Sequence, residues 1–535
     1  MKNIHLNYKP NYLRRKYSYN TKRYNKWIYK IFLSCLLIIQ PFFLTACSLS
    51  NPAFEIGTDM GIGMENDSKI KLSIMVEGGG MPVNSDEDPI LHALEEKLNV
   101  DMDFQVIQNE YTNSLNIRIA GGTAPDLFSV DHVQMYTYAN QDLLLDLTPY
   151  TGKMPRVQAV LTPEDWVKGM VDGKLVAISK RPYMKLDSLW IRKDWLDNLN
   201  LEIPATIYDF VEVAKAFTYN DPDQNGMDDT FGYTSSGMDV SGHDGFYCFS
   251  PLFGAFGTTQ EGRFYIKRGQ LIYSTEDPAF LDALNYIKSF IKTGAVDPEI
   301  LSNKNYAERE KAFSGQVGMI YIAWTDFVKG DLLKQMKAAD PDAKWIQIAD
   351  PVGPGGSFDS FIDLGDAPGR YAVPADIASD KLNKVMEFLN YIASGEGYDL
   401  VCYGLEREHY VRTERNKIIA LNKISEVGYS YNYQLIGRDE FKYYSIKYPL
   451  FTGYRNFAYN LERINVYNGS VPIPAGFNIV DLQAYEEQTL VNFLYGNTSL
   501  SQYDDFLKIL VNNYRLDIYK QSARTALEEL GYLTQ

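Results

Sequence analysis

Residues 70–76, Ile70-Lys-Leu-Ser-Ile-Met-Val76, carry apolar side chains at every second position, which is the pattern of a half-buried strand. Two more segments with strand character follow at residues 102–106 and 127–130. Between them lie two helix-like segments: residues 90–98 have their apolar side chains on one side, and residues 113–120 are closed by two glycines. Strands that alternate with helices at this spacing predict a parallel sheet with helices on its faces. The sequence therefore predicts an α/β fold.

Two loops at the ends of these strands indicate where a ligand would bind. In open parallel sheets, ligands bind beyond the carboxyl ends of the strands. Gly78–Gly80 follows the first strand, and Asp131 and His132 follow the third. The glycines lack the Lys-Ser/Thr pair of a phosphate-binding loop and the spacing of a dinucleotide fingerprint. We therefore interpret them as a flexible turn that lets a ligand approach the backbone.

The first 46 residues have the pattern of a secretory signal peptide. Residues 1–30 contain nine Lys and Arg and no acidic residue, and an apolar run follows at residues 31–43. A basic segment followed by a short apolar segment is typical of a signal peptide, and a membrane-spanning helix would need about 20 apolar residues. Residues 47–67, which are rich in Ser, Asn, Gly and Asp, predict a flexible tether.

The end of this leader, Leu44-Thr-Ala-Cys47, resembles the lipobox of bacterial lipoproteins. In that motif the Cys thiol takes a diacylglycerol, and the Cys becomes the new N-terminus. The resemblance implies lipidation of Cys47 and a protein anchored to the extracellular face of the cell membrane. The alternative is an ordinary signal peptide with a chance Cys.

The charge of the chain argues against nucleic acid as a partner. The 535 residues have a formal net charge of −16 at pH 7, and removal of the nine cationic leader residues leaves −25. Binding to nucleic acid needs a basic surface. The apolar content of 45% is that of a folded globular protein, and the chain beyond the leader is too long for one core. We expect two domains. Two cysteines remain beyond Cys47, Cys248 and Cys402, which form either one disulfide or two buried thiols.

The segment Asp221-Pro-Asp-Gln-Asn-Gly-Met-Asp-Asp229 has the spacing of a calcium-binding loop. Oxygen-bearing side chains stand at its first, third, fifth and ninth positions, and Gly at the sixth permits a sharp turn. The predicted calcium ligands are Asp221, Asp223, Asn225, Met227 through its backbone carbonyl, and Asp229. The twelfth position is Gly232, where an EF-hand has a bidentate Glu, so the sequence predicts a structural calcium ion and not a regulatory one. The alternative is a solvated acidic turn.

Several blocks together resemble one protein family. They are Gly121-Gly-Thr-Ala-Pro-Asp126, Trp190-Ile-Arg-Lys-Asp-Trp-Leu196, Asn220-Asp-Pro-Asp-Gln-Asn-Gly226, Gly315-Gln-Val-Gly-Met319, Tyr371-Ala-Val-Pro-Ala375, Ser394-Gly-Glu-Gly-Tyr398 and Gly404-Leu-Glu-Arg-Glu-His-Tyr410. In their order and spacing, and with the lipobox, they resemble the large lipoprotein subgroup of family 1 extracellular solute-binding proteins. Members of this family serve carbohydrate ABC importers, mostly in Gram-positive bacteria, and the calcium loop recurs among them.

This resemblance implies a two-lobe, periplasmic-binding-protein-like α/β fold of type II, with hinge strands that join the lobes and a ligand cleft between them. The expected lobes are residues 68–186 with 366–410, and residues 187–365 with 411–535 and its helical extension. The crossing segments would lie near Lys185–Leu189 and Gly365–Tyr371. The resemblance also implies a monomer that binds its ligand without chemistry and docks in its closed form on the permease of an ABC importer.

A carbohydrate ligand determines which residues are expected in the cleft. Sugars expose apolar ring faces and many hydroxyls, so a sugar site needs aromatic platforms and planar polar side chains. Trp324 is the expected stacking platform, because it follows a strand end and the block that ends at Met319. The other candidates are Asp131 and His132 after the third strand, Tyr183 and Lys185 before the first crossing, and Trp166 and Tyr371.

The main alternatives are a lipid-anchored hydrolase that acts on glycans and a ligand-binding sensor or peptide-binding lipoprotein. The chain has five His and contains neither Gly-x-Ser-x-Gly nor His-Glu-x-x-His, so we predict a binding protein and not an enzyme. The net negative charge disfavours a polyanionic ligand unless Arg181 and Lys185 make the cleft locally basic.

Overall fold

The computed structural model describes residues 69–82, 84–238, 245–304, 306–328 and 330–533. The predicted signal peptide, the tether and the lipidation of Cys47 lie outside the described residues. Each helix in the described part of the chain is too short or too polar to span a bilayer.

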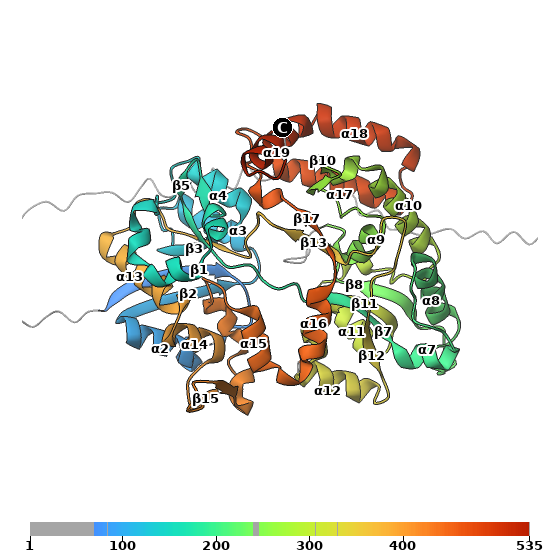
Figure 1. The fold of residues 1–535 in the computed structure, drawn as a ribbon, viewed down its shortest axis with the longest axis horizontal. Helices are drawn as coiled ribbons and strands as arrows, with labels where there is room; N and C mark the ends of the chain where they lie inside the picture. The colour runs from blue at the N-terminus through green and yellow to red at the C-terminus, as the bar shows by residue number, and fades with distance from the viewer. Residues whose placement is uncertain (1–68, 83, 239–244, 305, 329, 534–535) are drawn as a thin grey trace, which may run out of the picture. The chain divides into compact units, whose positions relative to one another are not determined.

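The predicted N-terminal α/β unit is present as a five-stranded sheet (Figure 1). Its strands are β1 (Ile70–Glu77), β2 (Val100–Ile107), β3 (Leu127–Val130), β6 (Ala177–Ser179) and β14 (Arg370–Ala372). Their order is β2-β1-β3-β14-β6, and β1 pairs in parallel with both β2 and β3. β14 pairs antiparallel with β3 and with β6, so a strand from far along the chain completes the sheet.

Local sequence signals fix the ends of α2 (Pro89–Leu98), the first helix on this sheet. The Asp88 carboxylate accepts the backbone N–H groups of Ile90 and Leu91 at 2.9 and 3.1 Å. Asn99 ends the helix in the left-handed conformation, with φ 50°. The other elements of this part are α3 (Tyr111–Ala120), α4 (His132–Ala139), α5 (Pro155–Val160), α6 (Pro163–Val167), α13 (Ser379–Ala393), α14 (Glu396–Tyr403), and the short strands β4 (Met170–Val171) and β5 (Lys174–Leu175).

A second sheet is built from residues in the middle of the chain. Its strands are β7 (Asp187–Arg192), β8 (Phe231–Ser235), β11 (Val317–Ala323) and β12 (Trp345–Ile348), in the order β12-β7-β11-β8. β11 is parallel to β8 and antiparallel to β7, which pairs antiparallel with β12. Its helices are α7 (Lys193–Leu199), α8 (Ile207–Tyr219), α10 (Pro278–Lys292), α11 (Ala307–Phe313) and α12 (Gly330–Ala339).

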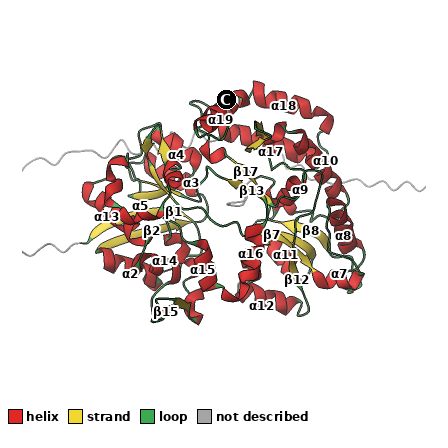
Figure 2. Ribbon diagram, viewed as in Figure 1, coloured by secondary structure: helices red, strands yellow, loops and turns green. Residues whose placement is uncertain are grey.

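A third sheet, which the sequence patterns do not predict, joins segments that are distant in sequence. Its strands are β9 (Phe264–Lys267), β10 (Gln270–Tyr273), β13 (Ser360–Asp363) and β17 (Arg463–Val466), in the order β10-β9-β17-β13. The remaining elements are α9 (Ser250–Ala255), α15 (Glu440–Lys447), α16 (Thr452–Asn460), α17 (Ile479–Leu494), α18 (Tyr503–Asn512), α19 (Leu516–Glu529), β15 (Tyr410–Arg412) and β16 (Ile418–Ala420). Figure 2 shows helices around the strands of all three sheets.

Two crossing segments connect the first sheet to the other two. Residues 180–186 run from β6 to β7, and residues 364–369 run from β13 to β14. They overlap with the crossings expected near Lys185–Leu189 and Gly365–Tyr371. Both segments therefore join the ends of strands that belong to different sheets. The cavity described below lies beside them.

Asn432 and Tyr433, which the expected lobe boundary assigns to the second lobe, contact the first part of the fold. The Tyr433 hydroxyl donates to the Asp88 carboxylate at 2.6 Å, and Asn432 Nδ2 donates to the Gly79 carbonyl at 2.9 Å. These bonds attach the two residues to the loops beside β1 and α2. Tyr444, farther along the same segment, packs edge-on against Trp324 in the turn after β11.

Cys248 and Cys402 are both fully buried free thiols. Cys402 packs in the core around β1 and α13, and Cys248 packs in the core around α8 and α10. The alternative of a disulfide between them is therefore wrong, and the alternative of two buried thiols is confirmed.

Candidate ligand-binding site

A cavity of about 740 Å³ lies beside the two crossing segments. Its walls are residues 182–187, the end of β11 with the turn after it, and β13 with residues 366–368. The lining is completed by Ser236, Arg263, Glu308, Arg309, Tyr459 and Arg463. The crossing segments, the second sheet and the third sheet with the segments beside them therefore form the walls of this cavity.

Four aromatic residues line the cavity, and one of them, Tyr321, is almost completely buried. Tyr183 and Tyr459 are 43% and 51% exposed, so each presents part of its ring to a ligand. Tyr459 packs edge-on against Phe441, with 4.6 Å between the ring centroids, which holds its ring in place. Phe361 of β13 is the fourth. The cavity therefore offers apolar ring surface from both the first crossing segment and the C-terminal part of the chain.

One wall of the cavity carries an ion pair. Arg309 Nη2 lies 3.0 Å from Asp326 Oδ2, and the Arg309 guanidinium stacks over the ring of Tyr306 at 3.9 Å. Asp326 is almost completely buried, whereas Tyr306 is exposed. A buried carboxylate paired with a fixed guanidinium gives this wall a rigid acceptor and donor for ligand hydroxyls.

The opposite wall is backed by a buried carboxylate network. Arg463 pairs with the fully buried Asp359 at 3.0 Å, and the hydroxyls of Tyr321 and Ser360 donate to the same carboxylate at 3.1 and 2.9 Å. Burial raises the pKa of Asp359 to about 6, although the Arg463 charge opposes this shift. Burial and the Asp359 charge also raise the pKa of Asp350 well above its usual value. The network fixes Arg463 at the cavity surface.

Lys185 and Arg263 approach one aromatic ring in the cavity. Lys185 Nζ is 5.2 Å from the centroid of the Phe361 ring, and the Arg263 guanidinium is 4.7 Å from it. Burial lowers the pKa of Lys185, and the charges of Arg463 and Arg263 lower it further, against the opposing effect of Asp187 and Asp359. Two cationic side chains therefore lie near Phe361, in a lining that also contains the carboxylates of Asp187, Glu308, Asp326, Asp363 and Asp366.

Of the seven residues predicted to bind the ligand, Tyr183 and Lys185 line the cavity. Trp324 does not: it is fully buried and packs edge-on against Tyr444 and Tyr448, at centroid distances of 5.3 and 5.9 Å, whereas the residues on both sides of it line the cavity. Successive residues of the short turn after β11 point in different directions, and Trp324 points into the core. Tyr371 is buried in β14, and Trp166 is half-buried in α6 against the same core.

Asp131 and His132 also lie outside the lining of the cavity and have structural partners. The Asp131 carboxylate accepts the Gln134 N–H at 2.7 Å, and the Gln134 side chain accepts the Asp131 N–H at 3.0 Å, which caps α4. His132 Nε2 donates to the Val471 carbonyl at 3.0 Å. Burial, with a smaller contribution from the Arg370 charge, lowers the pKa of His132 to about 4, so the ring is neutral near pH 7.

The cavity residues that the sequence patterns missed come from distant parts of the chain. Phe361 and Arg463 stand on β13 and β17, whose pairing brings together residues about a hundred positions apart. Tyr459 lies at the end of α16, one of 40 tyrosines in the chain. No local motif marks these residues, because only the third sheet places them together.

The predicted calcium loop joins α8 to β8 and is held by its own hydrogen bonds. The Asp221 carboxylate accepts the N–H groups of Asn225 and Gly226 at 3.0 and 3.1 Å. Asn225 Nδ2 donates to Asp223 Oδ2 at 2.9 Å and to Asp229 Oδ1 at 3.4 Å. Among the described residues, no group of three or more His, Cys, Asp or Glu is arranged to hold a metal ion.

Two further observations concern the chemistry of this loop. Asp223 Oδ1 is buried and has no hydrogen-bond partner among the described residues, and burial raises the pKa of this carboxyl, with the neighbouring Asp221 and Asp229 adding to the shift. Thr230, in contrast, donates its hydroxyl to the Phe217 carbonyl at 2.6 Å, so its oxygen is committed to α8.

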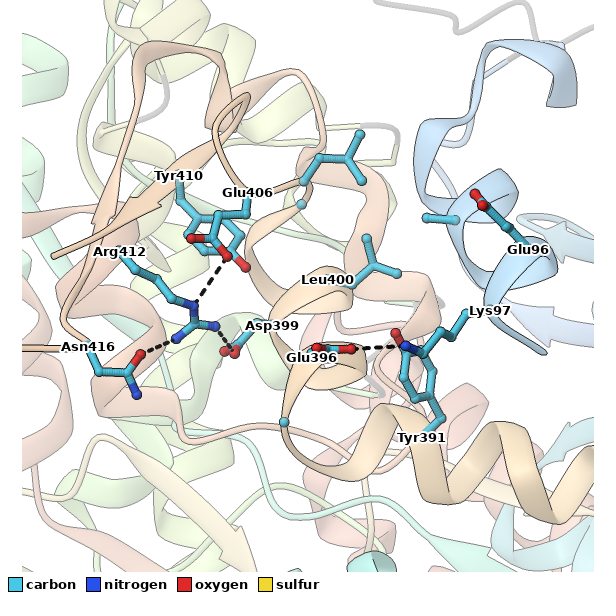
Figure 3. Close-up of a pocket in the computed structure, with 14 residues that line it drawn as sticks. Glu96, Lys97, Tyr391, Glu396, Asp399, Leu400, Glu406, Tyr410, Arg412 and Asn416 are labelled. Carbon is cyan, nitrogen blue, oxygen red and sulfur yellow. Dashed lines mark hydrogen bonds and ion pairs between the residues drawn. The ribbon is translucent and has the colours of Figure 1, made fainter. Parts of the chain in front are cut away.

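A second cavity of about 740 Å³ lies beside α2 and α14, and its charges are paired with one another (Figure 3). Lys97 Nζ contacts Glu396 at 3.1 Å. Arg412 pairs with Asp399 and Glu406 and donates to the Asn416 side chain. This cavity is lined by residues of α2, α13, α14 and the segment up to Asn416, whereas the cavity at the crossings is lined by the crossing segments and by parts of the second and third sheets.

Comparison with known protein families identifies the class of the chain. The family described as bacterial extracellular solute-binding protein matches residues 87–398, which is more than half of the chain. The chain belongs to this family. Solute-binding proteins bind a ligand and do not transform it, so this solute-binding protein is not an enzyme. The resemblance stated from the sequence is confirmed.

Individual relatives agree with this family. The polygalacturonan/rhamnogalacturonan-binding protein YtcQ of Bacillus subtilis (strain 168) is 25% identical over 504 residues, which cover 90% of this chain and 94% of YtcQ. The structure of the substrate-binding protein FusA of S. pneumoniae in complex with kestose has a TM-score of 0.70 at 17% identity, and the match covers 86% of this chain and 100% of FusA. The crystal structure of the alginate-binding protein AlgQ2 without calcium ion has a TM-score of 0.68 at 17% identity, with 86% and 99% covered. These structures confirm the two-lobe α/β fold of the solute-binding protein.

Proposed function

We propose that this solute-binding protein captures an oligosaccharide in the cavity beside the crossing segments and delivers it to an ABC importer. The observation that carries the proposal is the pair of partly exposed tyrosine rings, Tyr183 and Tyr459, in one cavity with the Arg309–Asp326 pair. Aromatic faces stack on the C–H faces of sugar rings, and charged side chains bind hydroxyls. The volume of about 740 Å³ is within the range of small-ligand sites.

Binding without chemistry is sufficient for this role. A ligand held by Tyr183 and Arg309 that also contacts the first sheet would gain both sets of contacts only in a closed form. The ligand therefore shifts the protein toward a closed form, and that form is the one that we expect to dock on the permease. The names of YtcQ and FusA, which describe carbohydrate ligands, support a carbohydrate for this chain.

The proposed location is the extracellular face of the cell membrane, with Cys47 as the lipid anchor. The basic and apolar leader and the lipobox-like end at Cys47 support this anchor. Replacement of Cys47 by Ser is expected to release the protein into the medium, which fractionation of cells would measure. Equal retention of the variant in the membrane would contradict the anchor.

The test of ligand capture is calorimetric titration and thermal shift with a panel of oligosaccharides. A ligand of the native state raises the melting temperature by mass action. Tyr459→Ala and Tyr183→Ala are each expected to weaken binding by about tenfold or more, because each removes a stacking face. Tyr208→Ala is the matched control, since Tyr208 is 75% exposed on α8 and does not line the cavity. Full affinity in both cavity variants would overturn the assignment of the site.

We further propose that the loop of residues 221–229 binds a structural calcium ion. The donor set fits, because Asp221, Asp223 and Asp229 supply carboxylates and Asn225 supplies an amide oxygen. The unpartnered, buried Asp223 Oδ1 needs a positive partner. Asn225 Nδ2 now lies between two of these carboxylates, so rotation of this amide would replace a donor with an oxygen ligand. The backbone carbonyl of Met227 would complete the set.

A further inference from the structure

The charged side chains of the cavity differ in whether they already have a partner. Arg309 pairs with Asp326, and Arg463 pairs with Asp359, both at 3.0 Å. Two acidic side chains that line the cavity, Asp363 and Asp366, also have partners. Asp366 pairs with Arg370 at 3.0 Å, and Asp363 accepts the N–H groups of Gly365 and Gly469 at 2.9 and 3.0 Å.

Lys185 also lines this cavity. Among the residues that the structure describes, its ammonium group forms no ion pair and no hydrogen bond. The group lies over the ring of Phe361, with Nζ 5.2 Å from the ring centroid. Removing an ammonium group from water without an anionic partner costs free energy. A ligand that brings the missing negative charge reduces this cost.

The neighbours of Lys185 increase this cost. The Arg263 guanidinium lies over the same Phe361 ring at 4.7 Å, and Arg463 also lowers the pKa of Lys185. Asp187 and Asp359 have the opposite effect, but the Asp359 carboxylate is already bonded to Arg463, Tyr321 and Ser360. Lys185 and Arg263 therefore share one aromatic ring, and neither Asp187 nor Asp359 forms an ion pair with Lys185. An anionic ligand group beside this ring would supply the ion-pair partner that Lys185 lacks.

We propose that the oligosaccharide carries a carboxylate, as a uronic acid does, and that Lys185 binds this carboxylate beside the ring of Phe361. The inference rests on the proposed function, because it assigns the chemical class of the ligand in the same cavity. The tyrosine rings bind the apolar faces of the sugar, and Lys185 supplies the charge that selects an acidic sugar over a neutral one.

The experiment compares ligands that differ only in charge. Trigalacturonate and trimannuronate are titrated against the full chain without its leader, and the methyl ester of trigalacturonate serves as the neutral form with the same skeleton. Galactotriose and kestose are the neutral panel. We expect an acidic trisaccharide to bind at least about tenfold more tightly than the ester, with an affinity that falls as ionic strength rises.

Variants of Lys185 test whether this residue recognises the negative charge of the ligand. Lys185→Met keeps the aliphatic stem over Phe361 and removes the ammonium group, so affinity for the acid should fall by about tenfold while affinity for the ester changes by less than about twofold. Lys185→Arg should restore binding of the acid. Lys215→Met is the matched control, because it removes the same charge from an exposed position on α8. Melting temperatures of the ligand-free variants verify that they fold.

The outcomes separate the inference from the proposed function. If neutral trisaccharides bind and the acids do not, or if Lys185→Met binds the acid as tightly as the parent protein, the inference is wrong and carbohydrate capture stands. If no member of either panel binds, the proposed function fails, and the inference fails with it.

Discussion

Trp324 and Tyr459 illustrate how aromatic residues near the cavity divide between the core and the ligand. Trp324 is fully buried between Tyr444 and Tyr448, whereas half of the Tyr459 surface is exposed in the cavity. We expect Trp324→Ala to lower the free energy of unfolding by about 3–5 kcal/mol, because it leaves a large core cavity. Trp324→Phe retains a packed ring, so ligand affinity in that variant should change by less than about twofold. A large loss of affinity in Trp324→Phe at an unchanged melting temperature would show instead that Trp324 contacts the ligand.

The buried carboxyl group of Glu486 should make the free energy of unfolding depend on pH. It is fully buried and accepts hydrogen bonds from Tyr273 and Thr275 at 2.6 and 3.0 Å. Burial raises its pKa from 4.5 to about 7, so the folded state holds this proton more tightly than the unfolded state does. The stability that this group contributes is therefore complete below about pH 4.5 and is lost as the pH rises through about 7.

The measurement is the melting temperature of the parent protein and of Glu486→Gln between mildly acidic and mildly alkaline pH. The parent should lose stability as the pH rises, by up to about 3 kcal/mol from this group, and Glu486→Gln should show a shallower dependence. Glu261, whose pKa burial raises to about 8, has the same sign and leaves part of the slope in the variant. Glu212→Gln, at an exposed position of α8, is the control. Equal slopes in parent and Glu486→Gln would contradict the assignment.

The sequence predicts individual residues well only where a local pattern fixes their direction. Tyr183 and Lys185, which were expected at the ligand site, line the cavity beside the crossing segments. Asp131 follows a strand end as expected, but its carboxylate is used as a helix cap. Phe361 and Arg463 carry no local signal, since their meeting depends on a strand pair distant in sequence.

At the level of elements, the loop of residues 221–229 predicts opposite responses with and without calcium. Calcium at a hundredfold excess over its Kd should raise the free energy of unfolding by about 2.7 kcal/mol, and so raise the melting temperature. A chelator should reverse the shift. Asp223→Asn should abolish the response. Without calcium, the same variant should be as stable as the parent or more stable, because burial and the neighbouring Asp221 and Asp229 raise the pKa of Asp223 and so destabilise its charged form.

Asp228→Asn is the matched control for this loop, since Asp228 is exposed and is not among the predicted ligands. It should retain the calcium response. An unchanged melting temperature of the parent protein in calcium and in chelator would refute the calcium site.

The elements of the first sheet were predictable because their signals are local. The apolar alternation of β1 and the cap at Asp88 lie within a few residues of the structure that they specify. The third sheet was missed because its strands are short and pair across long stretches of chain, as β9 and β17 do at Tyr265 and Val466. For the same reason, no local pattern indicates the contacts of Asn432 and Tyr433 with the loops beside β1 and α2.

For the whole molecule, the two buried thiols give a simple probe of global unfolding. Cys248 and Cys402 are fully buried in different cores, and burial raises the pKa of both thiols. In protein without its first 67 residues, which precede the compact unit Ser68–Gln535, a thiol reagent should react slowly with the native state and with both thiols after denaturation. Reducing agent should leave the melting temperature unchanged. Rapid reaction of the native protein would contradict the packing of these cores.

The position of β14 has a consequence for the order in which the molecule is completed during synthesis. β6 is joined to the first sheet only through β14, and β14 is made long after β6. A ribosome that has finished the first half of the chain has therefore produced a sheet with a missing partner and an open edge. We therefore expect the first sheet to be completed only after residues far downstream have been made.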